Sequence, residues 1–257
     1  PSVRVVTEDG AEGNTLIEST QINTLVQPWG IAIDEHSFYL SDTSSNQIHE
    51  YTRENARKAS YRKTWSNVCK SAGSPRSIDI YQGSIYTICN FKSLARVSRG
   101  ADESTILGSL QVQQVFDLAV GTGTSPYLYF TARSSRTGLF RIPNLAANLN
   151  LAEKEWLGSV NANDINYDVL TRDQHQAHGL AVHEKTGHVF VARIQYASPY
   201  AMSVLKFDPN SGTWSTKPGA TPVAAVGDYL TSGRSHGNPW SEVYLGLKEE
   251  GEHATLW

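Results

Sequence analysis

Short apolar and β-branched runs alternate with polar turns along the chain, and no stretch repeats with the period of an α-helix. The first such unit spans residues 27–51. Residues 31–33, Ile-Ala-Ile, form a short apolar run, and residues 38–41 form a second run of the same kind. Residues 47–51 alternate like a strand with one exposed face. This pattern predicts three short strands joined by turns.

The same succession of three strands recurs three times, over residues 74–97, 115–142 and 177–207. A fourth short run closes each unit, at residues 65–68, 106–110 and 156–160 and at Trp214. Four-stranded units with Gly-rich turns at this repeat length are typical of a β-propeller, whose blades bury their faces against their neighbours. We therefore expect an all-β propeller of four-stranded antiparallel blades. The expected innermost strands lie at Ile31, Ile78, Leu118 and Leu180.

The two ends of the chain resemble parts of one further unit. Residues 238–247 begin a fifth unit with Asn-Pro-Trp, but the chain stops at Trp257. Residues 2–7 alternate like an outer strand, and residues 8–19 look like a polar connection. We expect a single domain over residues 1–257 in which the termini share a fifth blade. Six blades are the alternative, if the ring is completed elsewhere.

Composition narrows the classes of partner. The formal net charge of −3 gives no electrostatic reason to expect nucleic acid as a partner. No apolar run reaches the roughly 20 residues that span a bilayer, so we expect no membrane insertion. The two cysteines, Cys69 and Cys89, cannot form a four-cysteine zinc site, and they are either paired or two buried thiols. Because the chain opens at Pro1 without a Met or an apolar signal, a processed or trimmed chain is expected.

Residues 28–51 carry a family resemblance. The sequence PWGIAID, followed by FYLSDTSSNQIHEY, resembles an NHL repeat, a propeller blade with the pattern Pro-x-Gly-Ile-Ala-Val-Asp, then Tyr-Val-Ala/Ser-Asp-Thr, then Asn-x-Arg/Gln-Ile. The fourth unit matches in part, and the second and third match only in their strand pattern. The resemblance implies the propeller fold and leaves the activity open, because such propellers include lyases, hydrolases, sugar-lactone enzymes and protein-binding modules.

The alignment of the units selects two sets of candidate ligand-binding residues. One residue per unit stands at the entrance to the innermost strand, where we expect the mouth of the central channel: Trp29, Arg76, Phe116, His178 and Trp240. A second set stands at the end of the second strand: Asp42, Asn90, Arg133 and Arg193. Aromatic walls with three arginines, one carboxylate and one histidine suit a polar ligand. A purely structural role also stays open, with the tryptophans plugging the channel and the arginines bonded to carbonyl groups.

Metal sites are incomplete in the sequence. His175, His178, His183 and His188 crowd into fourteen residues, but the turn at 184–187 sends the last two toward the opposite end of the blade. Resemblance to peptidylglycine-amidating lyases implies zinc-binding histidines around the channel, and only His178 stands at such a position. Resemblance to gluconolactonase-like propellers implies calcium bound by a channel Glu, which we do not find. The remaining candidates for calcium are Asp42, Asn90, Asp117 and Asp164.

These observations lead to two functional hypotheses. The first is a secreted, extracellular binding or scaffolding propeller that holds a protein or an extracellular polymer and needs no cofactor. The alternative is a calcium- or zinc-dependent hydrolase or lyase that acts on a small polar substrate. No phosphate-loop, His-Glu-x-x-His or Cys-x-x-Cys motif is present, which favours the first. The polar insertion at residues 161–176 either covers the mouth or contacts a partner, or it has no task.

Overall fold

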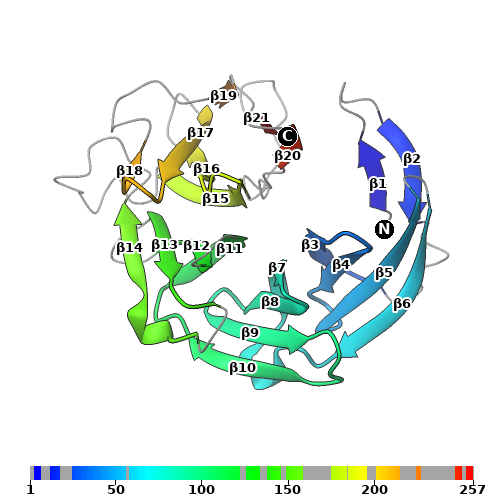
Figure 1. Ribbon diagram of the computed structural model, residues 1–257. Coiled ribbons are helices and arrows are strands. Elements are labelled where there is room, and N and C mark those ends of the chain that lie inside the picture. Colours follow the sequence, from blue (N-terminus) through cyan, green and yellow to red (C-terminus); the bar gives the residue numbers. More distant parts are fainter. Residues whose placement is uncertain are drawn as a thin grey trace. The chain divides into compact units, whose positions relative to one another are not determined.

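A computed structural model of the chain gives a structure composed almost entirely of β-strands (Figure 1). It describes residues 3–6, 12–17, 25–55, 58–121, 126–133, 138–145, 149–158, 175–183, 185–195, 201–214, 224–226, 247–250 and 253–256. The chain divides into two compact units, Pro1–Leu110 and Gln111–Trp257, which are described in turn. The helical turns in the described residues are two short 3₁₀ turns, η2 (Lys70–Ala72) and η3 (Leu151–Glu153). The expectation of an all-β fold is therefore confirmed.

The first unit contains two four-stranded antiparallel sheets in which strands that follow one another in sequence are neighbours. The strands of the first sheet are β3 (Pro28–Ile33), β4 (Ser37–Asp42), β5 (Gln47–Asn55) and β6 (Lys58–Ser66). The strands of the second are β7 (Pro75–Tyr81), β8 (Ser84–Cys89), β9 (Ser93–Ser98) and β10 (Ser104–Ser109). Each sheet is one propeller blade.

The second unit repeats this plan. Its first blade consists of β11 (Gln114–Gly121), β12 (Tyr127–Arg133), β13 (Gly138–Ile142) and β14 (Glu155–Gly158). Its second consists of β15 (His175–Val182), β16 (Val189–Gln195), β17 (Ala201–Asp208) and β18 (Thr213–Trp214), with β19 (Ala224–Val226) also paired to β17. The predicted first strands at Ile31, Ile78, Leu118 and Leu180 are confirmed, because these residues lie in β3, β7, β11 and β15.

The count of five or six blades is corrected, because the described part of the chain contains four. Near the amino terminus, β1 (Val3–Val6) pairs with β2 (Glu12–Ile17), a strand inside the stretch that we expected to be only a connection. Such local pairing closes a short loop at low entropic cost. Near the carboxyl terminus, β20 (Leu247–Glu250) pairs with β21 (His253–Leu256). Residues 238–246, the start of the expected fifth unit, lie outside the described residues, and the shared blade stays a prediction.

Each unit has an apolar core between its two blades. In the first unit, large side chains of the first sheet, such as Tyr39 and Trp65, are buried together with Ile85 of the second. Cys69 and Cys89 belong to this core with no exposed surface, and they form a disulfide bond. The question of pairing that the sequence left open is thereby answered. The core of the second unit likewise joins side chains of its two sheets.

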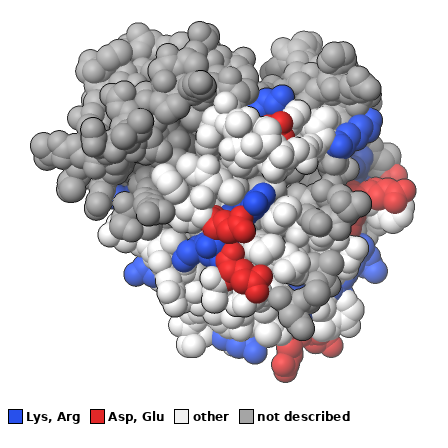
Figure 2. Space-filling model, turned by 60° about the vertical axis from the view of Figure 1, so that its left-hand side comes forward, with Lys and Arg blue, Asp and Glu red and all other residues white. Residues whose placement is uncertain are grey.

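Surface charge is mixed in sign. On the face shown in Figure 2, basic and acidic side chains of the described residues lie next to one another. This distribution fits the small net charge of −3. The described residues that are visible on that face form no broad region of one sign.

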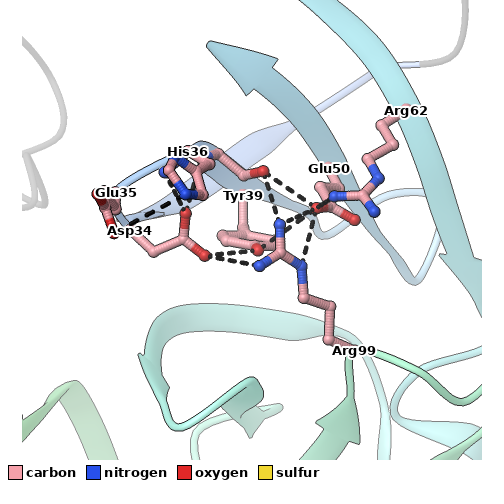
Figure 3. Close-up of polar contacts among 8 residues, drawn as sticks. Asp34, Glu35, His36, Tyr39, Glu50, Arg62 and Arg99 are labelled. Atoms are coloured by element: carbon pink, nitrogen blue, oxygen red, sulfur yellow. Dashed lines mark hydrogen bonds and ion pairs between the residues drawn. The ribbon is translucent and has the colours of Figure 1, made fainter.

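An ionic cluster around the buried carboxylate of Glu50 joins the two blades of the first unit at the end where β3 ends (Figure 3). Arg99, which follows β9, donates from Nη2 to Oε1 of Glu50 at 2.7 Å and from Nη1 to Oδ2 of Asp34 at 3.2 Å. The Glu50 side chain is only 2% exposed. Burial acts to raise the pKa of Asp34, but hydrogen bonds from His36, Ser37 and Tyr39 and the charge of Arg99 lower it below its ordinary value. Asp34 is therefore a charged turn anchor.

Candidate functional site

The register of each innermost strand slips at the same point, near the start of the strand. The slips lie between Pro28 and Ile31, Pro75 and Ile78, Val115 and Asp117, and Ala177 and Leu180. The residues inside these irregularities include four members of the first predicted set: Trp29, Arg76, Phe116 and His178. A bulge re-aims side chains out of the regular pleat and commonly borders a functional site. The four positions chosen from the sequence are therefore equivalent in structure.

In the first unit, backbone contact between the blades brings two of these bulges together. The Gly30 N–H donates to Oγ of Ser41 at 2.7 Å, and the Ser41 hydroxyl donates to the carbonyl of Arg76. A Cβ on Gly30 would lie 2.5 Å from that carbonyl oxygen, so the approach of β7 requires a glycine. Thr43 adds a hydrogen bond of 3.2 Å from Oγ1 to the carbonyl of Pro75. These hydrogen bonds between β3, β4 and β7 place Trp29 beside Arg76.

The Arg76 guanidinium lies against two aromatic rings. Its Cζ is 4.1 Å from the ring centroid of Trp29 and 3.6 Å from that of Phe91. The two rings meet edge to face, with centroids 6.3 Å apart. All three residues are partly exposed. A cation over an aromatic face at an exposed site is worth about 0.5–1 kcal/mol, which holds the arginine in place at the surface.

Phe91 is a site residue that the sequence analysis missed. It lies in the three-residue connection between β8 and β9, in a turn that the hydrogen bond from Lys92 N to the Cys89 carbonyl closes at 3.1 Å. Asn90 and Phe91 have φ values of 46° and 64°. In such a turn glycine is preferred at the second position, and a bulky residue there costs about 1–2 kcal/mol. The contact of this ring with the arginine of the neighbouring strand makes Phe91 a candidate site residue.

Two members of the second predicted set border this cluster. Asp42 is fully buried, and its carboxylate accepts hydrogen bonds from the backbone N–H groups of Val26 at 2.7 Å and Gln27 at 3.0 Å. Burial acts to raise the pKa of Asp42, but these hydrogen bonds keep it below its ordinary value. Asp42 therefore shapes the loop that leads to Trp29. Asn90 is exposed and packs closely on Gly73. A Cβ atom added to Gly73 would lie 2.5 Å from the Cβ of Asn90.

The other predicted residues fall in the second unit or outside the described residues. Phe116 is 9% exposed, and Arg133 is partly exposed at the end of β12, opposite Gln114. His178 and Arg193 lie within β15 and β16, and their side chains lie outside the described part of the structure, as does all of Trp240. Their contribution to a site stays a prediction.

Within the described residues, no group of three or more His, Cys, Asp and Glu side chains lies close enough to hold a metal ion. Of the candidates for calcium, Asp117 accepts hydrogen bonds from the N–H groups of Leu118 at 2.9 Å and Leu180 at 2.8 Å, which ties the two blades of its unit together. Asp164 lies outside the described residues. Among the helical segments that the structure describes, none has the length and apolar character to cross a membrane.

Comparisons with known proteins show the fold and no family. No protein-family model matches the chain, and no curated protein matches its sequence. A crystal structure of a protein of unknown function from Bacteroides thetaiotaomicron is similar with a TM-score of 0.59 and 12% identity, over 84% of this chain and 52% of that one. A chain in a nidogen/laminin complex is similar with a TM-score of 0.53 and 13% identity, over 84% and 70%. The chain thus spans about half the length of the first of these.

Proposed function

We propose that this protein is a binding propeller of the NHL-repeat type that holds a partner protein or an extracellular polymer through the ends of its innermost strands. The observation that carries the proposal is the cluster of Trp29, Arg76 and Phe91. Its three side chains are partly exposed, two of them stand at equivalent bulges, and the third is kept at a backbone cost.

The contact surface that we propose in the first unit consists of Trp29, Arg76, Asn90 and Phe91, with Asp42 as the anchor of the adjoining loop. In the second unit the proposed contacts are Phe116, Arg133, His178 and Arg193, together with Trp240. Aromatic residues and arginine are the side chains most enriched at the energetic centres of binding interfaces. Propellers of many functions share this fold, so the proposal depends on the site and not on the fold.

An oxidising, extracellular location fits the buried disulfide between Cys69 and Cys89, since such bonds persist mainly outside the cytosol. The structure of similar fold from the nidogen/laminin complex belongs to a protein assembly, which offers a precedent for a binding role. We propose that binding needs no metal ion. Exhaustive dialysis against EDTA is expected to leave it unchanged.

The test is an array of peptides and polysaccharides probed with the purified chain and with the Trp29→Ala/Phe91→Gly variant. Circular dichroism and the melting temperature check that the variant is folded. We expect the wild type to bind at least one ligand class and the variant to lose most of that binding, because contact residues at the centre of an interface carry most of its energy. An array on which the wild type binds nothing, or on which both proteins bind alike, would overturn the proposal.

A further inference from the structure

We infer that the ligand of the first unit is an acidic polypeptide segment, an inference that rests on the proposed function and names its partner class. The inference starts from the loops of this unit, which fall at two opposite ends because the strands are antiparallel. One end, where β3 and β7 begin, carries Trp29, Arg76 and Phe91. The other end carries the turns after β3, β7 and β9.

Charge is separated between these two ends. At the end with the aromatic cluster, the described loops are residues 25–27, 43–46, 67–74, 90–92 and 110, and their charged side chains are Lys70 and Lys92, both exposed. The carboxylate at that end, Asp42, is fully buried and bonded to backbone N–H groups. The accessible charge on the described loops of this end is therefore positive.

The described loops at the opposite end of the unit carry more carboxylates than cations. Its described loops, residues 34–36, 82–83 and 99–103, carry four carboxylates and one arginine: Asp34, Glu35, Asp102, Glu103 and Arg99. The arginine is held in ion pairs with Asp34 and Glu50. Asp102 is likewise paired with Lys63. The exposed carboxylates Glu35 and Glu103 therefore disfavour an acidic ligand at this end, whereas the exposed lysines favour it at the other.

The two basic loops are fixed next to each other. The Cys69–Cys89 disulfide joins the loop that carries Lys70 to the strand that leads into the turn with Lys92. Close packing of Gly73 on Asn90 adds a second contact between that loop and that turn. The backbones that carry Lys70 and Lys92 are thereby held against each other, and a pre-organised backbone lowers the entropic cost of binding.

A polypeptide fits this end better than a densely charged polymer does. Val26 is 66% exposed in the loop that leads to Trp29, and the rings of Trp29 and Phe91 are partly exposed. Apolar surface between separated positive charges matches a segment in which carboxylates alternate with apolar side chains. Nucleic acid and sulfated polymers need a continuous basic track, whereas the charged side chains on the described loops of this end are two lysines, Lys70 and Lys92.

The experiment measures fluorescence anisotropy of the full chain with a labelled pool of peptides in which Glu alternates with degenerate Val, Leu and Tyr. The matched pools carry Gln or Lys in place of Glu, and the other probes are polygalacturonate and oligo-dT. The variant is K70E/K92E, and the control is R53E, a charge reversal at an exposed residue far along β5. We expect affinity for the Glu pool to fall about tenfold or more in K70E/K92E and to change less than about twofold in R53E.

The outcomes separate the two proposals. The acidic-peptide inference is overturned if the Gln pool, polygalacturonate or oligo-dT binds as well as the Glu pool does. The binding proposal is intact in that case if Trp29→Ala/Phe91→Gly abolishes the binding. The acidic-peptide inference is also overturned if K70E/K92E and R53E bind the Glu pool equally. If no probe binds, or if Trp29→Ala/Phe91→Gly binds as the wild type does, the binding proposal itself fails for this end of the unit.

Discussion

The Arg99→Met substitution should destabilise the first unit more than any surface change, because it removes the charge that neutralises a buried carboxylate. Glu50 loses two hydrogen bonds to its Oε1, from Nε at 3.1 Å and Nη2 at 2.7 Å. It keeps a hydrogen bond from Ser37 at 3.1 Å and the ion pair with Arg62 at 2.9 Å, but the Arg62 side chain is 54% exposed. Removing one partner of a fully buried pair costs about 3–5 kcal/mol.

The cost here should be smaller than that limit. Arg99 is 29% exposed, so water screens part of its charge, and Arg62 remains beside Glu50. We expect a loss of about 2 kcal/mol in the free energy of unfolding, which is roughly a thirtyfold change in the unfolding constant. Urea unfolding at neutral pH, followed by tryptophan fluorescence, measures it. The Glu50→Gln background should recover about half of the loss, because a neutral amide needs no counter-charge.

Two further observations check this reasoning. The folded-state pKa of Asp34 lies below its ordinary value of 3.8, so its stabilising contribution is present above pH 3.8 and is lost as the pH falls through the folded-state pKa. The effect of Arg99→Met should therefore shrink in that acidic range. Asp102→Ala breaks only an exposed ion pair with Lys63, and its melting temperature should match the wild type. If Arg99→Met is as stable as Asp102→Ala, or if its effect is unchanged in the Glu50→Gln background, the assignment of the cluster is wrong.

Three other perturbations test the parts of the first unit that position the site. Gly30→Ala should lower the free energy of unfolding by about 1–3 kcal/mol, because its methyl group meets the backbone of β7. The control is Gly100→Ala, which should leave the melting temperature unchanged because no atom lies within 4 Å of the added Cβ. The Cys69→Ala/Cys89→Ala variant should lose about 3 kcal/mol in urea unfolding, as expected for a bond that closes a 20-residue separation, and an equal urea midpoint would contradict this. Burial lowers the pKa of His49 below 6.5, and the charge of Asp42 offsets only part of this lowering. Because the unfolded state then binds the proton more readily, the free energy of unfolding should decline as the pH falls below 6.5. This dependence on pH should flatten in His49→Gln. A slope that is identical in the two proteins would refute the assignment to His49.

Strand order and the innermost strands could be predicted from the sequence because they follow a local rule. Strands such as β4 and β11 are buried along almost their whole length, so apolar runs such as that around Leu118 recur from blade to blade. The run around Ile31 follows the same repeat, although Ile31 and Ile33 are 46% and 58% exposed. The strand Glu12–Ile17 escaped prediction because Gly13 and Asn14 are poor strand formers, and its pairing with β1 depends on tertiary context.

The site was predictable only where it follows the repeat. Trp29 and Arg76 were chosen because they occupy one position of the repeated unit, and the structure places both in bulges that touch. Phe91 belongs to a turn outside the repeat pattern, and only its φ of 64° and its contact with Arg76 reveal it. The role of Asp42 as a loop anchor likewise depends on backbone N–H groups that the sequence does not place.

The measurement that tests the central claim most directly is hydrogen exchange of the full chain with and without a saturating amount of the Glu peptide pool. Binding at the aromatic and basic end of the first unit should slow exchange of backbone amides in residues 26–30, 67–76 and 90–92. Exchange in residues 34–36, 82–83 and 99–103, at the acidic end of the same unit, should not change. Protection confined to the acidic end, or spread equally over both ends, would contradict the account.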